Sequence, residues 1–222
     1  GLSFAEDIET RVVIFSGSGK HFSSGADLSS EPDQEASQLK KRRDSRAGEG
    51  AILALLNMDQ ITIASWNRAA MGGGACIATA CDFRIGTPTS FMQYPEIDIG
   101  VNLMWKSLPL LINLIGPSRS KRLVIGGDRI TGEELHAWGI LDKLVTEEEL
   151  DREATLLAEK YARKAPIAAQ MIKQSTNNIV NALSNEIMHM DFDQNLFTAQ
   201  TRDRSTAINS YLDKTEPDFE GD

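Results

Sequence analysis

Apolar residues in the first two thirds of the chain fall in short runs of two kinds. Residues 11–16 (RVVIFS) and 61–65 (ITIAS) are rich in β-branched residues, which predicts two buried strands. Residues 51–58 instead repeat their apolar positions with the period of a helix, after a charged stretch at 31–49. Alternation of strand and helix predicts an α/β fold.

Glycine and proline mark the ends of further elements. Residues 108–115 are helical in pattern and are followed by Gly116-Pro117, a stop signal, and residues 91–100 predict a strand or loop because Pro95 breaks a helix. Residues 147–209 are almost continuously helix-forming. We therefore expect a core at residues 1–145 and a helical C-terminal region at residues 146–222. Two more helices are predicted, at residues 118–126 and 132–138.

Composition excludes several functional classes. The net charge is −9 for 222 residues, without a basic stripe, so a nucleic-acid partner is not expected. The chain has neither a spanning apolar run nor a signal-peptide pattern at its start, which predicts a soluble cytoplasmic protein without a membrane partner. Cys76 and Cys81 suggest no disulfide, and the three scattered histidines lack ligand spacing, so no metal site is expected.

A glycine triplet is the first candidate for chemistry. Gly72, Gly73 and Gly74 lie directly before a predicted helix, where the backbone can approach a ligand and direct free N–H groups toward negative charge. Close packing of the turn explains the glycines equally well. A second N–H donor from the turn at residues 23–27 would favour an anion site, if both strand ends share one edge of a sheet.

Three sequence blocks make the resemblance specific. VVIFSGSGKHFSSGADL (12–28), SWNRAAMGGGACIATACDFRIG (65–86) and FMQYPEIDIG (91–100) are similar in spacing to motifs of the crotonase (enoyl-CoA hydratase/isomerase) superfamily. The resemblance covers roughly residues 10–215. It implies a spiral of ββα units with a C-terminal helical region. It also implies an enzyme that acts on an acyl-CoA thioester.

The resemblance assigns residues to an oxyanion hole and to coenzyme A. The N–H groups of Ala26 and Gly73 would bind the thioester oxygen, where negative charge develops during the reaction. No cofactor is implied other than the coenzyme A that forms part of the substrate. The positions implied in substrate or coenzyme A binding are Lys20, Ser24, Gly25, Asp27, Leu28, Gly72, Gly74 and Cys76.

The acid/base positions depart from the family pattern. Hydratases of the family use two glutamates twenty residues apart, and here these positions hold Cys76 and Glu96. A single carboxylate suits Δ3,Δ2-enoyl-CoA isomerisation, which is the favoured reaction. Asp98 is an alternative carboxylate. The other readings are an enoyl-CoA hydratase, a C–C bond hydrolase of the superfamily, and a non-catalytic acyl-CoA-binding paralogue.

Further departures concern the fold and the assembly. Arg68 replaces a usual glycine, and Met104 stands where dienoyl-CoA isomerases carry an aspartate, which disfavours that reaction. Residues 1–145 are expected to lack the family's first strand and helix, and therefore to expose a sheet edge. The resemblance implies a homotrimer or hexamer built through the C-terminal helices, with apolar residues such as Met188, Met190, Phe192 and Phe197 in contacts.

Overall fold

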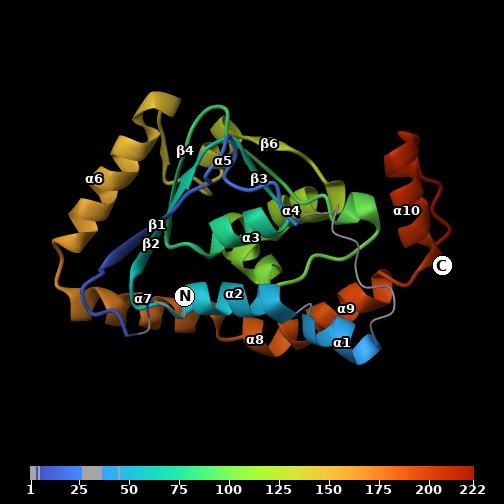
Figure 1. The fold of residues 1–222 in the computed structure, drawn as a ribbon, viewed down its shortest axis with the longest axis horizontal. Coiled ribbons are helices and arrows are strands. Elements are labelled where there is room, and N and C mark those ends of the chain that lie inside the picture. The colour runs from blue at the N-terminus through green and yellow to red at the C-terminus, as the bar shows by residue number, and fades with distance from the viewer. Residues whose placement is uncertain (1–3, 5, 27–36, 45) are drawn as a thin grey trace.

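The computed structural model describes residues 4, 6–26, 37–44 and 46–222, and leaves out the side chains of Gln38, Asn185 and Ile187. Two small sheets lie between helices (Figure 1). Helix α6 (Leu150–Ala162) packs on one side of the larger sheet, and α3 (Gly73–Ala80) lies near the centre of the molecule. Helix α10 (Arg202–Asp213) lies at the far end of the molecule from α6.

The larger sheet is parallel and has the strand order β1-β2-β4-β7. Both strands predicted from β-branched runs are confirmed, and the central one is buried along all but its first residue. Strand β1 stands at an edge of the described sheet. The bounds are β1 (Val12–Phe15), β2 (Ile61–Trp66), β4 (Phe83–Gly86) and β7 (Lys143–Leu144).

The smaller sheet brings the chain back beside the start of α3. Strand β5 pairs with β3 in parallel and with β6 in antiparallel fashion. Ser23 forms an isolated bridge with Ala70, so the segment after β1 runs along this sheet. The bounds are β3 (Ala69–Met71), β5 (Phe91–Gln93) and β6 (Ile130–Thr131).

The predicted stop at Gly116-Pro117 is a kink. Helix α4 (Ser107–Gly126) has helical geometry on both sides of Gly116, which adopts φ 75° and ψ 169°. The two helices predicted for this region therefore form one interrupted element, because Pro117 begins a new helical turn where its missing N–H costs nothing. The helix predicted at residues 132–138 is α5 (Gly132–Ala137), and a Thr131–Glu134 capping box stabilises its start.

All described elements after β7 are helical. Met188 and Phe192 are buried, whereas Met190 and Phe197 are exposed, so the apolar residues of this region divide between core and surface. The remaining elements are α1 (Gln38–Asp44), α2 (Arg46–Leu56), η2 (Ile97–Ile99), η3 (Glu147–Glu149), α7 (Pro166–Asn181), α8 (Ser184–Ile187), η4 (Met188–Met190) and α9 (Asp191–Thr198).

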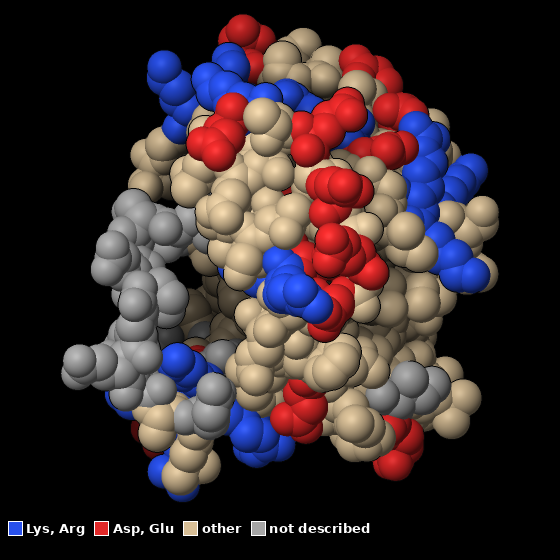
Figure 2. All heavy atoms as spheres, turned by 90° about the vertical axis from the view of Figure 1, so that its right-hand side faces the viewer, with Lys and Arg blue, Asp and Glu red and all other residues tan. Residues whose placement is uncertain are grey.

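The surface carries the negative charge unevenly. Figure 2 shows the face of the molecule that includes α10, where Asp and Glu side chains form a band across the surface. This band repels polyanions at close range. None of the described helices combines the length and apolar character needed to cross a membrane.

Candidate active site

A sharp turn at Gly72 joins β3 to α3. Gly72 adopts φ 49° and ψ −120°, and its N–H donates to the carbonyl of Gln93 over 3.0 Å. A Cβ at this position would lie 2.8 Å from Oε1 of Glu96. Glycine is therefore required here both for the positive φ and for the close approach of the carboxylate.

The N-terminal turn of α3 offers backbone donors. Gly72 has no side chain, so it cannot cap the N–H groups that open the helix, and no side-chain cap hydrogen bond is present. These groups carry partial positive charge and remain available to a ligand. Gly73, whose N–H is one of the two predicted oxyanion donors, is the first residue of this helix.

The turn that carries the second predicted donor lies against this helix start. The N–H of Ser23 donates to Ala69 over 2.9 Å, and the carbonyl of Ser23 accepts from Met71 over 3.0 Å. A Cβ on Gly74 would lie 2.5 Å from the Cβ of Ser23, which shows how closely the two turns pack. The structure thus brings the segments of the two donors together.

The remaining residues of this turn are described only in part. Gly25 has φ 90°, and a Cβ there would lie 3.0 Å from the carbonyl oxygen of Met71. Ser24 follows Ser23 in the turn, and Ala26 at its end is exposed. Asp27 and Leu28, both predicted to contact coenzyme A, lie outside the described residues.

Glu96 reaches the glycine turn from the other side. It precedes η2, and its Oε2 is buried without a hydrogen-bond partner. Burial raises the pKa of Glu96 to about 7, with a smaller contribution from the charge of Asp98. A carboxyl group in this state exchanges a proton near neutral pH, which is the property expected of an acid/base group.

Asp98 points to a different part of the molecule. A Cβ on Gly127, at the end of α4, would lie 3.0 Å from both carboxylate oxygens of Asp98. Glu96 instead lies beside Gly72. Of the two carboxylates considered from the sequence, the structure brings only Glu96 to the glycine turn.

Cys76 is buried one turn into α3. Burial raises the pKa of its thiol to about 12, although the Ser107 hydroxyl partly offsets this by hydrogen bonding. The thiol is therefore neutral at physiological pH and accepts no proton as a base. The Tyr94 hydroxyl is also buried, and this burial raises its pKa well above the ordinary value of a tyrosine.

Trp105 is a residue of this region that sequence reasoning missed. A Cβ on Gly73 would lie 2.4 Å from Cζ3 of its indole ring, and its Nε1 is buried without a partner. The residue after Trp105 is held by a buried carboxylate. The backbone N–H of Lys106 donates a hydrogen bond over 2.7 Å to Asp191, the first residue of α9. A tryptophan in an irregular segment carries no sequence signal for such a position.

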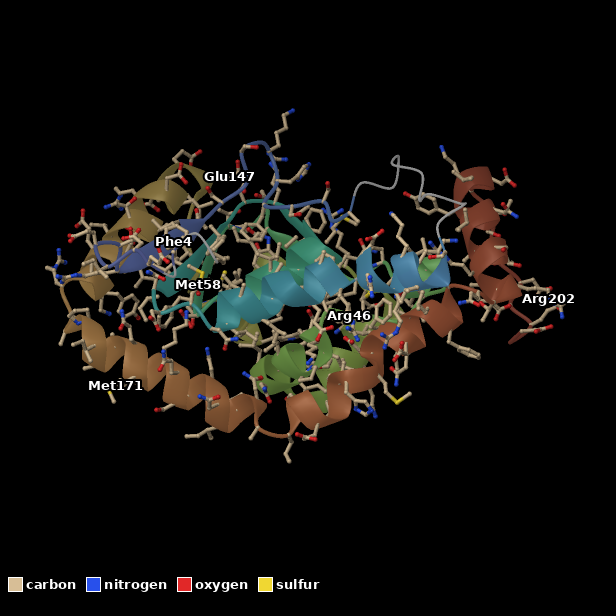
Figure 3. The ribbon with its side chains drawn as sticks, turned by 60° about the horizontal axis from the view of Figure 1, so that its bottom comes forward. Phe4, Arg46, Met58, Glu147, Met171 and Arg202 are labelled. Atoms are coloured by element: carbon tan, nitrogen blue, oxygen red, sulfur yellow. The ribbon has the colours of Figure 1, made fainter. Side chains whose placement is uncertain are left out.

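Lys20 lies apart from Glu96, in the loop that follows β1. It lines a polar cavity of about 460 Å³ together with Arg68 and Glu147, at the carboxyl ends of β1 and β2. Figure 3 shows Glu147 beside this loop. Arg68 adopts φ 50° and lies 3.7 Å from the Glu147 carboxylate. No group of described residues here or elsewhere has the ligands for a metal ion.

Comparisons with known proteins agree with this architecture. The crotonyl-CoA hydratase of Syntrophomonas wolfei is 27% identical over 215 residues, which is 96% of this chain and 82% of that protein. A peroxisomal Δ(3,5)-Δ(2,4)-dienoyl-CoA isomerase of Arabidopsis thaliana is 30% identical over 177 residues, which is 75% of this chain and 64% of that protein.

Solved structures share the fold, and a family model covers the chain. A crystal structure of an enoyl-CoA hydratase from Mycobacterium avium subsp. paratuberculosis has a TM-score of 0.85 at 20% identity, over 98% of this chain and 83% of that one. The model of the enoyl-CoA hydratase/isomerase family matches residues 2–222. The crotonase-type fold predicted from the sequence is thereby confirmed, and the chain belongs to the enoyl-CoA hydratase/isomerase family.

Proposed function

We propose that this protein is a Δ3,Δ2-enoyl-CoA isomerase in which Glu96 is the only acid/base carboxylate. The observation that carries the proposal is the combination of Glu96, whose Oε2 is buried without a hydrogen-bond partner, with a neutral thiol at Cys76, where hydratases of the family have a second glutamate. Water addition needs one group to activate water and another to protonate carbon. Isomerisation moves one proton between two carbons and needs one such group.

The proposed reaction conserves protons and electrons within the substrate and Glu96. The Glu96 carboxylate removes a proton from C2 of the 3-enoyl thioester, and the electron pair of the C–H bond moves into the thioester to form a dienolate. The N–H groups of Ala26 and Gly73 stabilise the oxyanion, where removal of one donor costs about 100- to 1,000-fold in rate. Protonated Glu96 then returns the proton to C4, which moves the double bond to C2–C3 and requires no further cofactor.

We expect the isomerase activity to depend on the ionisation of Glu96. Burial raises the pKa of Glu96 from 4.5 to about 7, so kcat/KM rises about tenfold per pH unit below this pKa and is constant above it. The same shift affects stability. Glu96 has a higher pKa in the folded protein than in the unfolded chain, so the free energy of unfolding falls as the pH rises from 4.5 to about 7. A pH–rate profile with its midpoint near 4.5 would contradict an enclosed Glu96.

The test of the proposed function follows the absorbance of the conjugated thioester. Purified protein is mixed separately with a 3-enoyl-CoA and with a 2-enoyl-CoA, and coenzyme A thioester binding is measured by calorimetry. Appearance of conjugation from the 3-enoyl substrate is the expected result. Binding without conversion would favour the acyl-CoA-binding paralogue, and absence of binding would overturn the acyl-CoA assignment.

Hydration is the second candidate because a relative found by sequence comparison is named as a crotonyl-CoA hydratase. Loss of conjugation from the 2-enoyl-CoA in the same assay would support it. The neutral thiol of Cys76 argues against this reaction, since no second carboxylate is present at that position.

The proposed assembly is a homotrimer or a pair of trimers. Helix α7 presents Ile167, Met171, Ile172 and Ile179 to solvent, and Figure 3 shows Met171 on the outer side of this helix. Several large apolar residues exposed on one helix support a subunit contact there. We propose that the C-terminal helices form this contact.

A further inference from the structure

The indole ring of Trp105 spans the gap between α2 and the start of α3. On one side, a Cβ on Gly48 would lie 1.8 Å from Cε2 and 2.1 Å from Nε1 of the ring. On the other side, a Cβ on Gly73 would lie 2.4 Å from Cζ3 and 2.5 Å from Cη2. The ring thus contacts backbone at both of its edges, and any side chain at either glycine would displace it.

The backbone beneath the ring is held in an unfavourable conformation. Trp105 and Lys106 have φ values of 69° and 55°, a left-handed geometry that side-chain-bearing residues rarely adopt in succession. Such geometry persists only where neighbouring contacts enforce it, and here two carboxylates do so. The Lys106 N–H donates to Asp191 over 2.7 Å, and its ammonium group lies 3.1 Å from the Glu49 carboxylate.

These contacts hold Lys106, the residue that follows Trp105, from two different elements. Glu49 belongs to α2, whose start at Arg46 is marked in Figure 3, and Asp191 begins α9. Asp191 is only 2% exposed. Because the residue after Trp105 is held by α2 and α9 and the ring itself packs on Gly48 and Gly73, the ring has little freedom to move aside for a ligand.

We propose that Trp105 sets the acyl-chain length by closing the space beyond the oxyanion hole, so that the protein selects short-chain acyl-CoA thioesters. This inference rests on the proposed function, because it takes the Gly73 N–H as a ligand of the thioester oxygen. An acyl chain that starts at Gly73 then meets the six-membered ring of Trp105 within its first few carbons. A smaller side chain at position 105 opens a channel between α2 and α3.

The test compares chain-length selectivity in matched variants. Binding of butyryl-CoA and decanoyl-CoA is measured by calorimetry, and kcat/KM is measured for 3-hexenoyl-CoA and 3-dodecenoyl-CoA. We expect Trp105→Ala to shift the short-to-long ratio of kcat/KM at least about tenfold toward the long substrate, with Trp105→Phe in between. Trp138→Ala is the matched control, since this indole contacts Arg119 and Arg122 rather than Gly48 and Gly73, and we expect its loss to leave the ratio unchanged.

Each outcome separates this inference from the proposed function. An unchanged ratio in folded Trp105→Ala overturns the role of Trp105 and leaves the isomerase proposal intact. A wild-type protein that binds decanoyl-CoA as tightly as butyryl-CoA also overturns it. Failure of the wild-type protein to bind any acyl-CoA overturns the proposed function and this inference with it. Thermal unfolding identifies a variant that does not fold, in which case Trp105→Phe and Trp105→Leu decide the result.

Discussion

We expect Glu96→Gln to lower kcat for isomerisation of a 3-enoyl-CoA about 1,000-fold, while KM changes little. Glutamine keeps the size of the side chain beside Gly72 but cannot accept the proton from C2. The proposed oxyanion donors are backbone groups and are not altered by the change. Steady-state kinetics with the conjugated thioester signal measure the loss, and calorimetry with butyryl-CoA shows whether binding persists.

Asp98→Asn is the matched control for this variant. It makes the same chemical change two residues along the chain, on a carboxylate that faces Gly127 rather than Gly72. We expect its kcat to stay close to that of the wild-type protein. A large loss in Asp98→Asn together with near-normal turnover in Glu96→Gln would assign the proton transfer to Asp98.

The second large effect concerns stability. We expect Lys173→Met to lower the free energy of unfolding by about 3 kcal/mol. Lys173 is only 7% exposed, and its ammonium group lies 2.8 Å from the Asp82 carboxylate and donates to the Gln60 carbonyl over 2.8 Å. Its removal leaves Asp82 mostly enclosed without its cation, and α7 loses its polar anchor on the sheet. Denaturant unfolding measures the difference.

Two further variants test whether the ion pair is the cause. A cavity of about 680 Å³ beneath α7 is lined by both Lys173 and Lys164, and Lys164 is exposed. The free energy of unfolding of Lys164→Met should stay within about 0.5 kcal/mol of the wild-type value. Asp82→Asn combined with Lys173→Met should recover part of the loss, because no uncompensated charge remains buried. Equal stability of Lys173→Met and Lys164→Met would show that the pair contributes little.

The parts of the fold that could be predicted are those with a local signal. The β-branched runs at β1 and β2 each show in a few neighbouring residues, and so does the break at Gly116-Pro117, although it is a kink within α4 and not the end of a helix. Strand β4 was not predicted, because its four residues follow α3 with no turn signal of glycine or proline between them. The two-residue strands β6 and β7 are too short for any periodicity to appear.

The residues of the candidate site also divide into those with a sequence signal and those without one. The glycine triplet and Glu96 lie in sequence blocks that match family motifs, so the resemblance predicted that they share one site. The structure places the Glu96 carboxylate beside Gly72. Trp105 and Asp191 are 86 residues apart in the chain and are linked through the Lys106 N–H. No local pattern encodes a contact between an irregular segment and a distant helix, so these residues could be found only in three dimensions.

The turn at Gly72 constrains how this site can diversify. Its φ of 49° and its close approach to Glu96 exclude every other amino acid there without rearrangement. The proposed oxyanion donors, being main-chain groups, survive substitution of the side chains around them. A lineage that keeps this turn is therefore free to exchange the residues at positions 76 and 105. Selection can thus act on proton-transfer chemistry and acyl preference separately, while the proposed enolate-stabilising turn is inherited unchanged.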